Sequence, residues 1–242
     1  MKNVLINLVL FFKYGYKSTS NLYYKYLKNK GIELGNNVKF YSPWTINIDI
    51  QRPWMIKIGN NVKITSGVKI LQHGYDWSVL QKKYGDVLGS CGKVDIGNNV
   101  FIGVNTTILK DVTICDNVII GANSLVCKSI NKEGVYAGNP AKYLMSIDEY
   151  YKKRLDCQIE EAVNLVNMYY LKYGRYPKKE LLREFFWLFE ERKNEINSVF
   201  DDVLKLQDNY EFSKSKFLNS TSKFCGYDDF IDYVIKESNN NE

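Results

Sequence analysis

Aliphatic side chains recur at every sixth residue through the first half of the chain, in two separate runs. The second run has no interruption, and the first is interrupted only at Arg52. A period of six matches neither the 3.6-residue turn of an α-helix nor the two-residue alternation of a simple strand. The repeating positions are Leu34, Phe40, Ile46, Ile58, Ile64 and Ile70, and then Ile96, Ile102, Ile108, Ile114, Ile120 and Val126.

This period fits a short strand followed by a corner and another short strand. Three such sides close one triangular coil, and the inward aliphatic side chains of successive coils stack into a column. Gly-Asn-Asn triplets at 35–37, 59–61 and 97–99 suit the corners, since both residue types tolerate left-handed backbone angles. The pattern therefore predicts a parallel β-helix, because an ordinary β-sandwich would not hold such a repeat in register.

The repeat slips between its two runs. Ile70 and Ile96 are 26 residues apart, which is not a multiple of six, so residues 72–93 are predicted to leave the coil as an excursion loop. This loop contains glycines, charged residues and aromatic residues, and His73, the only histidine of the chain, lies near its start. Long loops on a rigid scaffold often carry function, so the loop is the first place to look for chemistry.

The segments on either side of the repeats have helical patterns. The apolar run from Val4 to Phe12 is too short to span a bilayer. We expect it either to pack as a helix on the body of the protein or to contact a membrane peripherally, helped by Lys13 and Lys17. After the repeats, Ser-Ile-Asp-Glu at 146–149 forms a capping box, which predicts a helix that continues to about Lys172.

Two further amphipathic helices are predicted over 178–196 and 227–235, with the aromatic residues of the first in a core. The sequence thus divides into an N-terminal helical segment (1–31), a β-helix domain (32–145) and a C-terminal helical region (146–242). We expect the last either to cap the β-helix and aid subunit contacts or to offer a platform for an acceptor or a partner.

Composition excludes several classes of function. The hydrophobic content of 45% and charged content of 25% are ordinary for a soluble globular chain. The net charge is +6, but the basic residues are scattered and no nucleic-acid-binding signature is present, so no nucleic-acid partner is expected. With five cysteines, no Cys-x-x-Cys and one histidine, no metal site is expected, and the thiols fit a reducing cytoplasm.

The segment Ile96–Leu144, with its hexads and its closing Gly-Asn-Pro-Ala-Lys, resembles the hexapeptide-repeat acyltransferases. Within them it is similar to galactoside and maltose acetyltransferases and to capsule or lipopolysaccharide O-acetyltransferases. The loop that begins His-Gly-Tyr-Asp-Trp resembles sugar O-acetyltransferases of surface-polysaccharide clusters most. The resemblance covers about residues 30–145 and implies a mainly β fold, a left-handed parallel β-helix flanked by a short N-terminal helix and a C-terminal α-helical region.

The resemblance also implies an activity and a setting for it. Acetyl-CoA would donate an acetyl group to a sugar hydroxyl during bacterial surface-polysaccharide synthesis, in the cytoplasm or at the inner face of the membrane. Family members are usually homotrimers with active sites between neighbouring subunits. Two alternatives remain open, namely N-acetylation of an amino sugar and a non-catalytic β-helix that serves as an assembly or binding module.

Candidate residues on the acceptor side follow from the loop. His73 matches the catalytic histidine of the family, and imidazole titrates near neutral pH, so it can take a proton from a hydroxyl. Asp76 either orients His73 or caps a turn, and Tyr75 and Trp77 either stack on a sugar ring or pack. The weaker candidates for acceptor binding are Asn47, Asp49 and Arg52, which lie in the irregular coil before the loop and either face the cleft or serve as corner residues.

Acetyl-CoA is expected along the later coils, where small residues let its pantetheine arm approach the backbone and a lysine attracts its phosphates. Cys127 is interpreted as part of the wall, because no second histidine is present to activate a thiol nucleophile. The positions that the resemblance implies for the coenzyme are Gly103, Gly121, Ala122, Ser124, Cys127, Lys128, Asn139, Pro140 and Lys142.

Overall fold

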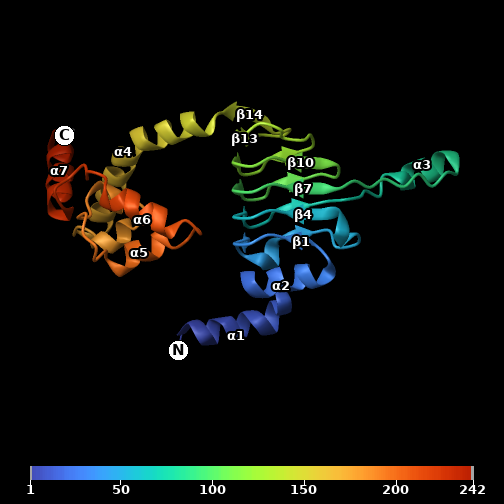
Figure 1. Ribbon diagram of the computed structural model, residues 1–242, viewed down its shortest axis with the longest axis horizontal. Coiled ribbons are helices and arrows are strands. Elements are labelled where there is room, and N and C mark those ends of the chain that lie inside the picture. Colours follow the sequence, from blue (N-terminus) through green and yellow to red (C-terminus); the bar gives the residue numbers. More distant parts are fainter. Residues whose placement is uncertain (1, 241–242) are drawn as a thin grey trace. The chain divides into compact units, whose positions relative to one another are not determined.

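The computed structural model describes residues 2–240 and contains two compact units, Met1–Tyr150 and Tyr151–Glu242. The first unit is a left-handed parallel β-helix whose coils stack in three sheets, which confirms the predicted fold class (Figure 1). One sheet contains β1 (Glu33–Leu34), β4 (Ile56–Ile58), β7 (Val94–Ile96) and β10 (Val112–Ile114).

The other two sheets complete the triangular coil. One contains β3 (Asn47–Ile48), β6 (Lys69–Ile70), β9 (Thr107–Ile108) and β12 (Leu125–Val126). The larger one contains β2 (Lys39–Phe40), β5 (Lys63–Ile64), β8 (Val100–Ile102), β11 (Val118–Ile120), β13 (Gly134–Ala137) and β14 (Lys142–Met145). Neighbouring strands are parallel except that β14 runs antiparallel to β13.

A column of branched aliphatic side chains fills the inside of the coils. This is the packing that the six-residue period predicts, because each repeating residue is covered by its equivalents in the coils above and below. The repeating residues from the second coil onward are 2% exposed or less, and they are Ile58, Ile64, Ile70, Ile96, Ile102, Ile108, Ile114, Ile120 and Val126.

The first coil departs from the repeat that the sequence suggested. Ile48, and not Ile46, stands beside Ile70 in the pairing of β3 with β6. Short 3₁₀ turns, η2 (Pro43–Thr45) and η3 (Pro53–Met55), lengthen the coil on either side of β3. Together they make the first coil six residues longer than a regular coil of 18. Six residues are one full repeat, so the six-residue pattern is again in phase at Ile58.

The corners use asparagine and glycine for different physical reasons. The second asparagine of each triplet, such as Asn61 and Asn99, has a positive φ (57° and 54°), whereas Gly59 does not. Gly59 is needed because the next coil is too close, since a Cβ there would lie 2.6 Å from the carbonyl oxygen of Gly97. The first asparagine links coils, as the Asn98 side chain accepts from the Asn60 N–H at 2.8 Å.

Helices close the first-coil end of the stack. These are α1 (Lys2–Tyr14), a 3₁₀ turn η1 (Gly15–Lys17) and α2 (Ser20–Lys30), which buries Tyr23 and Leu27 in the same core. The excursion loop leaves the side of the stack and carries α3 (Trp77–Tyr84), drawn in green in Figure 1.

The second unit is helical. The predicted capping box is confirmed, because Ser146 Oγ accepts from the Glu149 N–H at 3.1 Å and Glu149 Oε2 accepts from the Ser146 N–H at 2.7 Å. It begins α4 (Ile147–Tyr173), which ends before Gly174, a residue with φ of 65°. The predicted helix over 227–235 is confirmed within α7 (Tyr227–Asn240), and α5 (Ser198–Leu204) and α6 (Tyr210–Leu218) were not predicted.

The predicted helix over 178–196 is wrong. The segment forms two 3₁₀ turns, η4 (Lys179–Leu182) and η5 (Phe186–Leu188), joined by irregular backbone. Phe186, Leu188 and Phe189 are all buried, as predicted for a core, and such closely spaced positions do not share one face of an α-helix. Irregular backbone lets all three enter the aromatic core of the unit.

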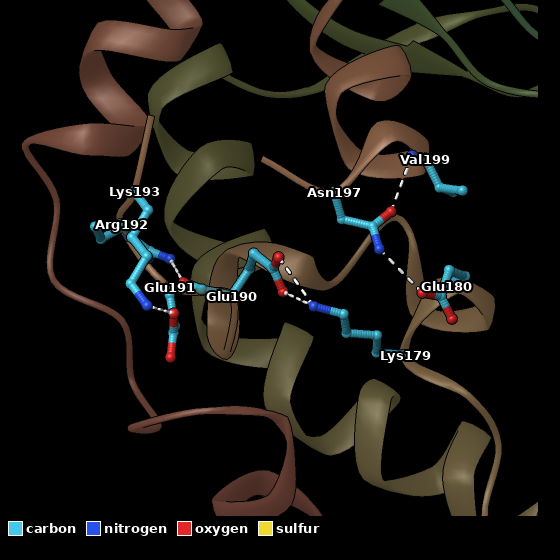
Figure 2. A network of polar contacts seen from close by, with 8 residues as sticks. All are labelled: Lys179, Glu180, Glu190, Glu191, Arg192, Lys193, Asn197 and Val199. Carbon is cyan, nitrogen blue, oxygen red and sulfur yellow. Dashed lines mark hydrogen bonds and ion pairs between the residues drawn. The ribbon is translucent and has the colours of Figure 1, made fainter. Parts of the chain in front are cut away.

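Polar contacts hold this irregular segment in place (Figure 2). Lys179 Nζ lies 2.8 Å from Glu190 Oε2, and the Glu190 residue is 9% exposed. Asn197 accepts from the Val199 N–H at 3.0 Å at the start of α5 and donates to Glu180 Oε1 at 3.0 Å. Arg192 donates to the carbonyl oxygen of Trp187 at 2.7 Å. These contacts replace the backbone ladder that a helix would have supplied.

Gly59→Ala tests the close approach of the coils. The added methyl group would meet the backbone of Gly97, so we expect the free energy of unfolding to fall by about 1–3 kcal/mol in urea denaturation. Gly89→Ala is the matched control, because a Cβ there meets no atom within 4 Å, and a change within about 0.5 kcal/mol is expected. Equal stability of the two variants would contradict this account of the corner.

Candidate active site

His73 lies where the excursion loop leaves the β-helix, three residues after the end of β6. Its backbone pairs in antiparallel fashion with Cys91, on the returning end of the loop. The Gly92 N–H also donates to the Gln72 carbonyl oxygen at 3.0 Å. The base of the loop is therefore closed by backbone hydrogen bonding, which fixes the position of the histidine although the loop beyond it extends away from the core.

A carboxylate from the preceding coil contacts the imidazole. Asp49 directly follows β3, and its N–H donates to the Ile70 carbonyl oxygen at 3.0 Å, so the pairing of β3 with β6 brings it beside His73. Nδ1 of His73 contacts Oδ2 of Asp49, and the two side chains are 20% and 9% exposed. Because an ionised carboxylate can only accept, the proton of a neutral imidazole lies on Nδ1 and Nε2 keeps its lone pair.

Backbone donors hold the Asp49 carboxylate in this orientation. Its Oδ1 accepts from the Gln51 N–H at 3.0 Å, and its Oδ2 accepts from the Gln72 N–H at 3.3 Å. These contacts come from both coils that flank the carboxylate. Hydrogen bonds of this kind restrict the side chain, so Asp49 can act as a fixed acceptor for the imidazole N–H.

Gln72 and the half-buried Arg52 lie beside this pair. Gln72 is fully buried, and its Nε2 donates to the Arg52 carbonyl oxygen at 2.8 Å. In the part of the chain that the structure describes, Gln72 Oε1 and Arg52 Nη1 are buried without a hydrogen-bond partner. Buried polar atoms nearly always have a partner, so these two atoms are exceptions in the wall beside His73.

Of the loop residues predicted to act beside His73, Tyr75 lies next to the imidazole, Trp77 lies next to Tyr75, and Asp76 has no described contact with the imidazole. The Tyr75 ring lies 5.9 Å from the His73 ring in an edge-to-face arrangement, and Trp77 lies 5.5 Å from Tyr75. Tyr75 is 66% exposed, so it is open to a ligand. Asp76 is exposed at the start of α3, and the carboxylate that contacts the imidazole is Asp49. Orientation by Asp76 stays a prediction that no described contact supports.

Three of the residues predicted to hold the coenzyme have structural contacts of their own. A Cβ on Gly103 would lie 2.6 Å from the Ala122 backbone nitrogen, and one on Gly121 would lie 2.8 Å from the Ala137 Cβ. Ser124 is 2% exposed, and its hydroxyl donates to the Gly121 carbonyl oxygen at 2.7 Å. Close stacking of coils explains these residue types without a ligand.

The other predicted binding residues lie at the surface of the last coils or of β3. They are exposed, and their proposed roles stay predictions: Asn47, Ala122, Cys127, Lys128, Asn139, Pro140 and Lys142. Within residues 2–240, no three or more histidine, cysteine or acidic side chains gather in a way that would hold a metal ion. The arrangement at His73 is that of an imidazole whose Nδ1 contacts a carboxylate.

Comparison with known proteins assigns the scaffold to a family. Residues 93–128 match the model "Bacterial transferase hexapeptide (six repeats)". Protein CapG of Staphylococcus aureus is 41% identical over 130 residues, which cover 54% of this chain and 74% of the relative. The chain belongs to the hexapeptide-repeat acyltransferases. The predicted family and enzyme class are thereby confirmed.

Two further matches lie in the same family. Galactoside O-acetyltransferase of Escherichia coli (strain K12) is 34% identical over 146 residues, which cover 59% of this chain and 67% of the relative. The solved structure of a galactoside acetyltransferase in complex with coenzyme A is 26% identical, with a TM-score of 0.45, over 61% of this chain and 82% of that chain.

Sequence reasoning found His73 in this acyltransferase but not the partner of its imidazole. Asp49 and His73 are 24 residues apart, and the hexad repeat put Ile46 at the inward position that Ile48 occupies in β3, an error of two residues. Because Ile48 pairs with Ile70, Asp49 directly follows β3 and lies beside the start of the excursion loop. Arg52 was a weak candidate from its place in the irregular coil, whereas Gln72 had no sequence signal apart from its position next to His73.

Because the chain has one histidine, the tautomer can be read directly. In protein labelled with ¹⁵N-histidine, two-dimensional NMR should show Nδ1 protonated at a pH well above the ordinary imidazole pKa of about 6.5. Asp49→Asn should shift the population toward the Nε2-protonated form, because the charged acceptor is lost. Asp76→Asn is the control and should leave the spectrum unchanged. The reverse result for these two variants would show that Asp76 orients the ring in solution.

Proposed function

We propose that this acyltransferase moves an acetyl group from acetyl-CoA to a hydroxyl of a sugar in bacterial surface-polysaccharide synthesis. The observation that carries the proposal is the contact between His73 and Asp49 at the base of the excursion loop. A hydroxyl is a weak nucleophile that needs a base, and this pair is a base with a fixed tautomer. Similarity to a galactoside O-acetyltransferase supports a sugar as the acceptor.

The proposed reaction takes place in one complex of enzyme, acetyl-CoA and acceptor. Nε2 of His73 takes the hydroxyl proton as the acceptor oxygen bonds to the thioester carbonyl carbon, which gives a tetrahedral oxyanion. A backbone N–H in the cleft would stabilise this oxyanion. The C–S bond then breaks, and the imidazolium returns the proton to the departing thiolate of coenzyme A. Asp49 stabilises the imidazolium between these two transfers.

The proposal gives the other predicted residues definite places. The pantetheine arm of acetyl-CoA would lie along the later coils near Ala122, and its phosphates near Lys128 and Lys142 at the end of the β-helix. Tyr75 and Trp77 would face the acceptor. The enzyme would be a homotrimer in the cytoplasm, where its acyl donor is made, and would meet lipid-linked acceptors at the inner face of the membrane.

His73→Ala is the first test of this function. Release of free coenzyme A thiol from acetyl-CoA, measured with a panel of sugars and surface oligosaccharides, should depend on the acceptor. The variant should lower kcat/KM by about 10²–10⁴, the usual size of a general-base contribution. Cys91→Ser and Cys127→Ser are controls for a thiol nucleophile, and both should keep activity within about threefold of the wild type.

Other outcomes of this assay have definite meanings. Unchanged turnover in His73→Ala with an amino-sugar acceptor would favour N-acetylation, because an amine has a free lone pair and depends less on a base. Loss of activity in Cys127→Ser with full activity in His73→Ala would overturn the proposed mechanism in favour of a covalent thiol intermediate.

Lys142→Ala tests the proposed place of the coenzyme phosphates. Removing one exposed charge should raise the KM for acetyl-CoA about two- to fivefold and leave the KM for the acceptor unchanged, since a surface ion pair contributes up to about 1 kcal/mol. Lys110→Ala, another lysine between the later coils, is the matched control. An equal effect of the two variants would mean that the contribution is only one of net charge.

A further inference from the structure

The described side chains of α1, from Leu8 onward, include an exposed apolar cluster. Four of its large side chains are 51–81% exposed, and their spacing of one, three and four residues places them on one side of a helix: Leu8, Val9, Phe11 and Phe12. Tyr14 points the other way and stacks on Trp44, with ring centroids 5.2 Å apart. A cluster of this kind is unfavourable in water, so it indicates a surface that another apolar phase covers.

The same part of the chain carries all of the net charge. Residues 1–32 contain six lysines and no aspartate or glutamate. The chain has 33 basic and 27 acidic residues in all, so residues 33–242 contain 27 of each and are neutral overall. The basic residues are spread along the chain, but the acidic residues that balance them elsewhere are missing at this end.

Most lysines of this end are exposed, and three of them also lie over tyrosine rings, namely Lys13, Lys28 and Lys30. Lys13, Lys25, Lys28 and Lys30 are exposed, and Lys13 directly follows the apolar cluster. Lys17 has another use, since it donates to the Ile46 carbonyl oxygen at 2.7 Å and burial lowers the pKa of its ammonium group. Figure 1 shows α1 and α2 together at the first-coil end of the β-helix.

We propose that this end of the enzyme binds the surface of a bilayer that contains anionic lipids. The apolar side chains of α1 would enter the interface, and the exposed lysines would lie among the phosphate groups. Tyr16, which is 44% exposed on the turn after α1, has the amphipathic ring that such an interface favours.

The length of α1 determines how it binds. Its 13 residues span about 20 Å, less than the roughly 30 Å of a hydrocarbon core, so α1 lies along the surface. No helix within residues 2–240 has the length and apolar character to cross a bilayer. The positive charge argues against a second copy of this end as the occupant, because two such ends would repel each other. The proposal is independent of the chemistry at His73.

The test is sedimentation of the full chain with vesicles. We expect binding to vesicles of phosphatidylcholine and phosphatidylglycerol at least about tenfold tighter than to phosphatidylcholine alone, and weaker as salt is added. Phe11→Ser/Phe12→Ser should weaken binding by about tenfold or more. Lys25→Gln/Lys28→Gln should weaken it by about fivefold for each lysine removed, and only on the anionic vesicles.

Matched controls come from the other unit. Phe212→Ser removes a phenylalanine that is 68% exposed on α6, and Lys152→Gln/Lys153→Gln removes two exposed lysines of α4; both should bind as the wild type does. Acetyl transfer to a soluble acceptor should be unchanged in all of these variants. Equal binding by test and control variants, or no binding to anionic vesicles, would overturn the proposal. A lower molecular mass of Phe11→Ser/Phe12→Ser in light scattering, without vesicle binding by the wild type, would assign the cluster to a subunit contact.

Discussion

Parallel backbone pairing between successive coils is the constraint on which the rest of this enzyme depends. The pairing aligns equivalent residues of neighbouring strands. An aliphatic residue in one coil therefore stacks on its equivalent in the next, as Ile58 does on Ile96. The corners must then come close enough for Gly59 to touch Gly97. Hydrophobic burial, the residue types at the corners and the height of every loop all follow from that single register.

The candidate active site is built where this regularity is broken twice. The excursion loop interrupts the second coil after Gln72, and the two 3₁₀ turns on either side of β3 lengthen the first coil. The ladder between β3 and β6 stays intact between these irregularities, and it brings Asp49 to His73. The rigid stack therefore fixes the base, while the irregular segments supply the buried Gln72 and the aromatic residues of the loop.

How much the sequence predicts depends on the range of the interactions involved. The β-helix was predictable because its repeat is local and each hexad carries the same signal. The loop and His73 were predictable as the break in that repeat. The Asp49 contact was not predictable, because the two insertions in the first coil add up to six residues, the length of one repeat. The repeat therefore resumes in phase at Ile58, and the shift between Ile46 and Ile48 is hidden. The segment 178–196 was also mispredicted, since its charges suggested a helical surface while Phe186, Leu188 and Phe189 all enter one core.

The antiparallel course of β14 has a consequence for the growth of the stack. A parallel β-helix presents unpaired strand edges at its last coil, and such an edge can accept a strand from another molecule. β14 turns back on β13, with Tyr136 opposite Tyr143, and so covers the edge of the largest sheet with a strand of opposite direction. A further coil in the same winding has no parallel edge to extend on that side. The reversal thus sets the point at which the parallel winding of the largest sheet ends.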